Sequence, residues 1–177
     1  GVIVACRLKS SRLKEKALLP IGDLPSVEFC LRNALKFNGI HKVILATSTE
    51  AQDQILERHT FDPKVGFYQG HPEDVMQRYI DVCEAYELDV VVRITADMPF
   101  VDDEICSFLL EEHFKSGAEY TVGTDAASAG SSADAAGSAG SELIRITRMS
   151  VAPDTPSRRT TRSGLPTRAA PAGSGVP

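Results

Sequence analysis

Four short, mainly apolar segments, separated by amphipathic ones, constrain this chain most. The apolar segments are residues 2–6, 43–46, 65–68 and 90–94. Runs of this kind are typical of strands that are buried on both faces of a sheet. Segments with helical apolar spacing lie between them, and this alternation indicates βαβ units. The sequence therefore predicts an α/β fold: a three-layer, Rossmann-like domain with a mostly parallel sheet and helices on both faces.

The helical segments are expected between and after these strands. They cover residues 25–39, 50–59 and 73–87, and a further helix begins after Asp102. Pro25 stands at the start of the first helix, and Thr49 and Asp102 are the expected N-caps of two others. A fifth, short strand is expected over residues 119–122.

The composition changes near residue 124. Every phenylalanine, tyrosine and lysine lies at or before Tyr120, and the remainder of the chain is dominated by small residues and proline. Such a segment buries too little apolar area to offset its ordering entropy. We therefore predict a folded domain over residues 1–124 and a linker-like, disordered or non-native tail over residues 125–177. A second interpretation stays open for an apolar cluster in the tail, which could dock on the domain as one short strand. That cluster is Leu143, Ile144, Ile146, Met149 and Val151.

The charge balance excludes some function classes. The 19 basic and 24 acidic residues give a net charge of −5, which does not indicate a general binding surface for nucleic acid. No stretch of about 18 apolar residues is present, so a membrane span is not expected. The start of the chain has no secretory-signal pattern, so we expect a cytoplasmic protein.

The cysteines and histidines have no metal-ligand spacing. The four cysteines form no C-x-x-C pair and lie in apolar runs, which indicates buried, reduced thiols. They are Cys6, Cys30, Cys83 and Cys106. The four histidines are expected at the surface or its boundary. They are His41, His59, His71 and His113.

A basic segment follows the first predicted strand. Its cations are Arg7, Lys9, Arg12, Lys14 and Lys16, and Ser10 and Ser11 lie among them. Arginine forks phosphate oxygens and lysine adds a point charge, so such a loop can surround a triphosphate. The P-loop motif is missing. Charge alone would also suit a solvated loop, but ligands of parallel sheets bind beyond the carboxyl ends of strands, which favours phosphate binding here.

Asp97 follows the fourth predicted strand, as the basic segment follows the first. Mg²⁺ is commonly held by one or two carboxylates together with substrate phosphates, so Asp97 is a candidate magnesium ligand. Residues 47–50 and 70–74 also follow strands. Their hydroxyl and acidic side chains could contact a base, ribose or sugar, or simply cap the following helices.

Three segments, in this order, resemble a known family. They are Arg7-x-x-Ser10-Ser11-Arg12-Leu13-x-x-Lys16-x-Leu18-Leu19-Pro20-Ile21, then Ala46-Thr47-Ser48, then Glu73-Asp74-Val75-x-x-Arg78-Tyr79 followed by Val91-Val92-Arg93-Ile94-Thr95-Ala96-Asp97-x-Pro99. Through them, residues 1–124 resemble the amino-terminal half of the cytidylyltransferases that activate surface-polysaccharide or acidic sugars. The resemblance is to the spore-coat polysaccharide (SpsF-type) and acylneuraminate cytidylyltransferase-like branches.

The resemblance implies a GT-A-like nucleotidyltransferase domain. Its members transfer a nucleotide from CTP to a sugar or sugar acid with Mg²⁺, giving a CMP-sugar and pyrophosphate, and a homodimer is possible. By motif matching, the catalytic residues are Arg12, Lys16 and Asp97, with Asp97 as the metal ligand. The nucleotide-binding residues are Arg7, Ser10, Ser11, Arg12, Lys16, Asp74 and Arg78.

The chain departs from the family pattern at several positions. Lys9 and Ala96 stand where glycine is usual, and Lys14-Glu15 replaces Pro-Gly. No counterpart of the family's second half is visible in residues 125–177. These departures motivate an alternative function, a truncated or degenerate domain that binds a nucleotide or a partner without catalysis. A glycosyltransferase of related fold is a third hypothesis, but it needs a D-x-D pair that Asp97-Met98-Pro99 lacks.

Overall fold

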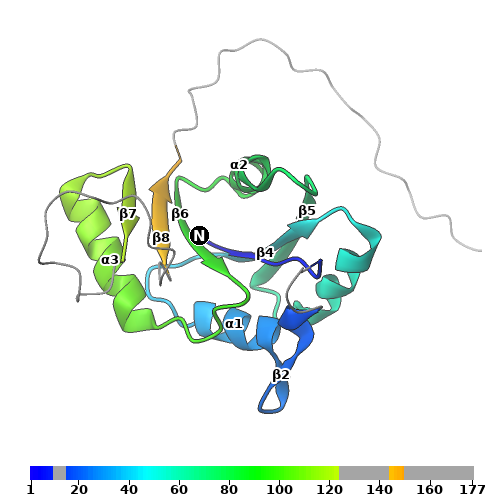
Figure 1. Cartoon of the computed structure of the whole chain (residues 1–177). Helices are drawn as coiled ribbons and strands as arrows, with labels where there is room; N and C mark the ends of the chain where they lie inside the picture. The colour runs from blue at the N-terminus through cyan, green and yellow to red at the C-terminus, as the bar shows by residue number, and fades with distance from the viewer. Residues whose placement is uncertain (10–14, 124–143, 150–177) are drawn as a thin grey trace, which may run out of the picture.

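A six-stranded sheet organises the computed structural model of the chain, which describes residues 1–9, 15–123 and 144–149 (Figure 1). The strands, in spatial order, are β5 Val65–Gly70, β4 Val43–Ser48, β1 Val2–Ala5, β6 Val90–Thr95, β8 Arg145–Arg148 and β7 Tyr120–Val122. The first four are parallel, and β8 runs antiparallel to both β6 and β7. The predicted α/β class with a mostly parallel sheet is confirmed.

Helices cover both faces of this sheet. The elements outside the sheet are η1 Lys16–Leu18, the β2 Pro20–Ile21 and β3 Leu24–Pro25 hairpin, α1 Ser26–Ala34, η2 Ala51–His59, α2 Val75–Tyr86 and α3 Asp103–Ser116. Helices α1 and α3 contribute to one hydrophobic cluster, and α2 contributes to the other. In Figure 1, α1 lies below the sheet and α2 above it, which gives the three layers.

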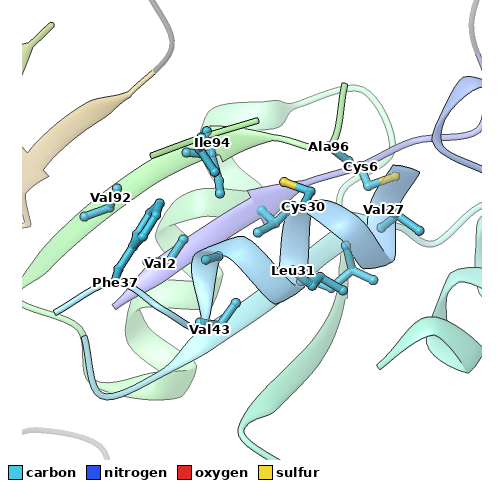
Figure 2. Packing of buried hydrophobic residues seen from close by; sticks show 14 of the residues in the cluster. Val2, Cys6, Val27, Cys30, Leu31, Phe37, Val43, Val92, Ile94 and Ala96 are labelled. Carbon is cyan, nitrogen blue, oxygen red and sulfur yellow. The ribbon is translucent and has the colours of Figure 1, made fainter. Parts of the chain in front are cut away.

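Strand β1 is a continuous apolar run because its alternate residues enter different hydrophobic clusters. Val2 and Val4 of β1 join the α1 and α3 layer, whereas Ile3 between them joins the α2 layer, and all three are fully buried. Figure 2 shows the first cluster, with Cys30 and Leu31 of α1 packed beside the sheet. Fully burying one such aliphatic side chain contributes about 1.5–3 kcal/mol. The central strands therefore form a rigid base for the segments at their carboxyl ends.

The helix ends match the predictions in part. The Asp102 side chain accepts hydrogen bonds from the backbone N–H groups of Glu104 and Ile105, as predicted for an N-cap. The prediction for Thr49 is wrong: η2 is a 3₁₀ helix that begins after Glu50 without a side-chain cap. Ser48, the residue before Thr49, accepts a hydrogen bond from the Glu50 N–H through its Oγ. Helix α1 ends at Ala34, several residues before the predicted stop.

Part of the predicted tail belongs to the sheet. Residues Arg145–Arg148 form β8, which pairs with β6 on one side and β7 on the other. Ile144 and Ile146 face the same cluster and are almost fully buried, which supplies apolar area that the flanking alanine, glycine and serine lack. The docked-strand interpretation is therefore correct for these four residues, and the disordered-tail interpretation is wrong for them. Residues 125–143 and 150–177 lie outside the described residues, so for them the division at residue 124 stays a prediction.

Two sequence predictions concern buried groups. All four cysteines are buried and free, as expected. The surface or boundary prediction is wrong for His113, which is fully buried on α3 and has Nδ1 2.8 Å from the hydroxyl of Thr121 on β7. The signal was available in the helix pattern, because His113 shares the buried face of α3 with Cys106 and Leu109. In the part of the chain that the structure describes, no helix has the length and apolar character to cross a bilayer.

Candidate active site at the carboxyl ends of the strands

A hollow of about 190 Å³ opens where β1 and β6 end, between residues far apart in the sequence. It is lined by Ala5, Cys6, Arg7, Lys16, Ala17, Ala96 and Asp97. Arg7 is the second residue after β1, Asp97 is the second residue after β6, and Lys16 begins η1. The structure thus brings together three of the predicted site residues at the edge where parallel sheets bind ligands.

Lys16 and Asp97 form an ion pair across this hollow. Lys16 Nζ lies 3.4 Å from Asp97 Oδ2, and both side chains are about half exposed. A hydrogen bond from the Thr95 side chain is the main cause that lowers the pKa of Asp97. The charge of Lys16 lowers the pKa further, and partial burial opposes both effects. The Asp97 carboxylate is therefore ionised and open to solvent at neutral pH.

Glu73 neutralises the other side of the basic segment. Its Oε1 lies 3.3 Å from Arg7 Nη2 and 3.9 Å from Lys9 Nζ, and its side chain is 69% exposed. Together with the Lys16–Asp97 pair, this gives every described cation of the segment a carboxylate partner. Exposed pairs of this kind are weak, so a polyanion can compete for the cations.

Arg78 and Asp74 build the loop that carries Glu73. Arg78 is buried, and its guanidinium donates from Nη2 to the carbonyl oxygens of His71 and Pro72, at 2.6 and 3.3 Å. The Asp74 carboxylate caps α2 by accepting the Gln77 N–H. Both side chains are thus engaged within the loop, whereas Glu73 projects from it.

Gly70 makes room for the buried arginine. A Cβ built at Gly70 would lie 2.8 Å from Arg78 Cγ and 3.1 Å from a ring carbon of Tyr68. A larger residue would therefore displace Arg78 from the carbonyl groups that it binds. Burial lowers the pKa of Arg78, and the nearby charge of Arg7 lowers it further.

The rest of the basic segment is only partly described. Ser10, Ser11 and Arg12 lie outside the described residues, so their predicted roles stay predictions. Glu15, where the family pattern has glycine, has φ 51° and ψ 30°, the left-handed conformation that glycine adopts readily. The glycine-like backbone is therefore kept at this position although the residue differs.

Sequence reasoning missed a buried carboxylate beneath the segment. Asp53 of η2 is fully buried; its Oδ1 accepts the Leu8 N–H at 2.8 Å, and its Oδ2 accepts the hydroxyl of Ser48. The sequence pattern predicts Ser48 only as a ligand contact or as a helix cap. The available signal was the spacing of Asp53 and Leu56, which places a carboxylate on the apolar face of a short helix.

The neighbouring thiols are poor nucleophiles. Burial raises the pKa of the Cys30 thiol to about 12, and burial also raises the pKa of Cys6 strongly. Negative charge at Asp97 adds to both increases. Nucleophilic catalysis by cysteine is therefore not favoured at this edge of the sheet.

The site offers one carboxylate to a metal ion. Among residues 1–9, 15–123 and 144–149, no group of three or more histidine, cysteine, aspartate or glutamate side chains could enclose a metal. Asp97 alone suits a hard cation that takes most of its oxygen ligands from phosphates and water. A larger hollow of about 550 Å³ lies at the opposite ends of β1 and β6, but its lining is mostly apolar and holds none of the cations that are predicted to bind phosphate.

Comparisons with known proteins agree with this geometry. Residues 1–139 match the cytidylyltransferase family. The spore coat polysaccharide biosynthesis protein SpsF of Bacillus subtilis is 32% identical over 123 residues, which cover 67% of this chain and 51% of that protein. A cytidylyltransferase structure from Leptospira borgpetersenii aligns with a TM-score of 0.70 and 25% identity over 84% of this chain and 59% of that one.

A CMP:2-keto-3-deoxy-manno-octonic acid synthetase in complex with CTP shares the fold. It aligns with a TM-score of 0.60 and 18% identity, covering 83% of this chain and 73% of that one. The chain spans about half the length of the curated relatives it matches. Because the family match covers most of the chain and includes the strands and loops that form the hollow, the chain belongs to the cytidylyltransferase family.

Proposed function

We propose that this domain transfers a cytidylyl group from CTP to a sugar or sugar acid, giving a CMP-sugar and pyrophosphate. The observation that carries the proposal is the meeting of Arg7, Lys16 and Asp97 in one hollow of a cytidylyltransferase-family domain. The match to a spore-coat polysaccharide protein supports a sugar substrate. The shared fold with a CMP-sugar synthetase that binds CTP supports the nucleotide.

In this proposal, the triphosphate takes the place of the carboxylate partners of the cations. Arg7 leaves Glu73 and forks phosphate oxygens, and Lys16 adds a point charge. Arg12, Ser10 and Ser11 contribute through the motif they share with the family. Asp74 and Arg78 act indirectly, because they hold the loop of residues 71–74 beside the nucleotide.

The reaction is an in-line displacement at the α-phosphorus. A sugar hydroxyl oxygen, whose proton passes to water, forms a bond to the α-phosphorus while the bond from the α-phosphorus to its bridging oxygen breaks, and pyrophosphate leaves with that electron pair. Lys16 and Arg12 stabilise the charge on the leaving group. Positioning of the two substrates and electrostatic stabilisation supply most of the acceleration.

Asp97 would hold Mg²⁺ in this scheme. Its ionised carboxylate fits a hard cation, and the phosphates would complete the oxygen ligands. When bound, Mg²⁺ supplies charge neutralisation on the phosphate oxygens. With the Asp97 carboxylate engaged in this way, Lys16 would be free to turn from Asp97 to the phosphates.

The test is calorimetry of CTP, UTP, GTP, ATP and dTTP with and without Mg²⁺, followed by pyrophosphate release with several sugars. We expect Mg²⁺-dependent, CTP-selective binding by the wild type. Asp97→Asn should abolish Mg²⁺-dependent turnover and keep the fold. Asp89→Asn is the matched control, because it changes an exposed carboxylate at the other end of β6. Retained turnover in Asp97→Asn would contradict the metal assignment.

A second function is favoured by one observation, the departure from the family pattern at Lys9, Lys14 and Glu15 in the basic segment. In that case the domain binds a nucleotide or a partner without chemistry. CTP binding without pyrophosphate release for any sugar would support it. Absence of binding to all five nucleotides would contradict cytidylyl transfer and nucleotide binding alike, and only partner binding would stay open.

A further inference from the structure

Both described ends of the basic segment meet at Leu8. The Leu8 N–H donates to Asp53 Oδ1 at 2.8 Å, and the Leu8 carbonyl oxygen accepts the Glu15 N–H at 3.4 Å. The Leu8 side chain is itself buried in the α1 and α3 cluster. Arg7 directly precedes Leu8 and Lys16 directly follows Glu15, so a shift of Leu8 would move both cations of the hollow.

Asp53 is the side chain that fixes Leu8 from below. Its carboxylate is held at both oxygens, by the Leu8 N–H and by the Ser48 hydroxyl. The Ser48 oxygen in turn accepts the Glu50 N–H at 3.2 Å. Asp53 is 45 residues from Leu8 in the sequence, and Ser48 ends β4, so these hydrogen bonds tie the basic segment to a distant strand of the sheet.

Holding one backbone N–H with a buried carboxylate carries an unfavourable desolvation free energy. This desolvation costs several kcal/mol unless charges and hydrogen bonds compensate. Among the described residues, no cationic nitrogen lies within 4.0 Å of Asp53, so its compensation comes from the two hydrogen bonds and from more distant positive charge. That charge includes Arg78: burial lowers the pKa of Arg78, and the charge of Asp53 opposes this effect. Asp53 thus lies against the backbone of Leu8, the residue that follows Arg7.

We propose that Asp53, fixed by Ser48, is a positioning residue that holds Leu8 so that Arg7 and Lys16 face the same phosphate chain. The proposal rests on the proposed function, because it assumes a triphosphate in the hollow. Asp53 is buried and touches no substrate; it acts through the backbone of Leu8. Its effect should therefore depend on how many phosphates the ligand carries, which a general loss of stability would not produce.

The experiment measures the affinities of CMP, CDP and CTP by calorimetry for the wild type, Asp53→Ala, Asp53→Asn and Ser48→Ala. We expect wild-type affinity to rise along this series. Asp53→Ala should weaken CTP about tenfold or more and CMP by less than about twofold, because a hydrogen bond to a charged group is lost. Asp53→Asn keeps one oxygen for Leu8 and should recover part of the loss. Glu57→Gln, an exposed carboxylate on the same helix, is the control.

The outcomes separate the two proposals. Equal losses for CMP, CDP and CTP, or no loss in a folded Asp53→Ala, would overturn the positioning role while the proposed function stands. If Asp53→Ala does not fold, Ser48→Ala decides in the same way, with an expected loss of about threefold confined to CDP and CTP. Absence of nucleotide binding by the wild type would overturn the proposed function and this proposal with it.

Discussion

Replacing Glu73 by glutamine removes the carboxylate that pairs with both Arg7 and Lys9, and we expect CTP to bind more tightly as a result. In the free protein, the triphosphate must displace this carboxylate from two cations at 3.3 and 3.9 Å. It must also bind beside the carboxylate, which repels it. Glutamine has nearly the same shape and leaves the backbone of the loop unchanged.

The magnitude follows from the exposure of the pair. An exposed ion pair contributes about 0.2–1 kcal/mol. The Glu73–Lys9 pair is long for an ion pair, with 3.9 Å between Oε1 and Nζ. Since the Glu73 side chain is 69% exposed, solvent screens both pairs, and we expect a total gain of about 0.5–1 kcal/mol. This corresponds to about a twofold to fivefold tighter dissociation constant.

The assay is calorimetric titration with CTP and Mg²⁺ at low and high ionic strength. The Debye length falls from about 10 Å at 0.1 M salt to about 3 Å at 1 M, so the gain should shrink at high salt. Glu111→Gln is the matched control, because Glu111 is exposed and pairs with Lys115 on α3, away from the hollow. Unchanged affinity at low salt would refute the competition, and weaker affinity would instead indicate that Glu73 contacts the nucleotide.

Two further predictions concern stability. Ile146→Ala in β8 should lower the free energy of unfolding by about 2–5 kcal/mol, because the side chain is fully buried. The partly exposed neighbour Thr147→Ala should cost much less, and equal urea midpoints for Ile146→Ala and the wild type would show that β8 is not docked. Burial, with the charge of Arg148 second, lowers the pKa of His113, so the unfolded chain binds this proton more readily and the free energy of unfolding should fall below about pH 6.5. His113→Gln should reduce that pH dependence in urea titrations, and equal slopes in both proteins would contradict the assignment.

The central fold could be predicted because strands buried on both faces have a simple sequence pattern. Residues 43–46 and 90–92 are apolar runs for the same reason as Val2–Ala5: residues on both faces of these central strands are largely buried. The position of β8 could not be predicted in this way. Its partners are set by contacts between residues distant in sequence, and a four-residue strand with arginine at both ends has little apolar pattern of its own.

The site was predictable to the extent that strand ends determine it. The positions of Arg7 and Asp97 after parallel neighbours β1 and β6 bring them to one edge, as expected. The partners of these residues depend on how loops fold over that edge. The sequence therefore did not reveal that Glu73 reaches Arg7, nor that Asp53 reaches the backbone of Leu8.

The strand order also affects how the protein assembles. β7 precedes β8 in the chain, yet it reaches the sheet only through β8, which lies between it and β6. Until residues 145–148 are present, β6 has an open hydrogen-bonding edge, and such edges promote association with other chains. A fragment cut where the composition changes, near residue 124, would keep the hollow and its cations but expose this edge. We therefore expect such a fragment to associate with other chains more readily than one that extends through Met149, whose N–H donates to the Asp89 carbonyl oxygen.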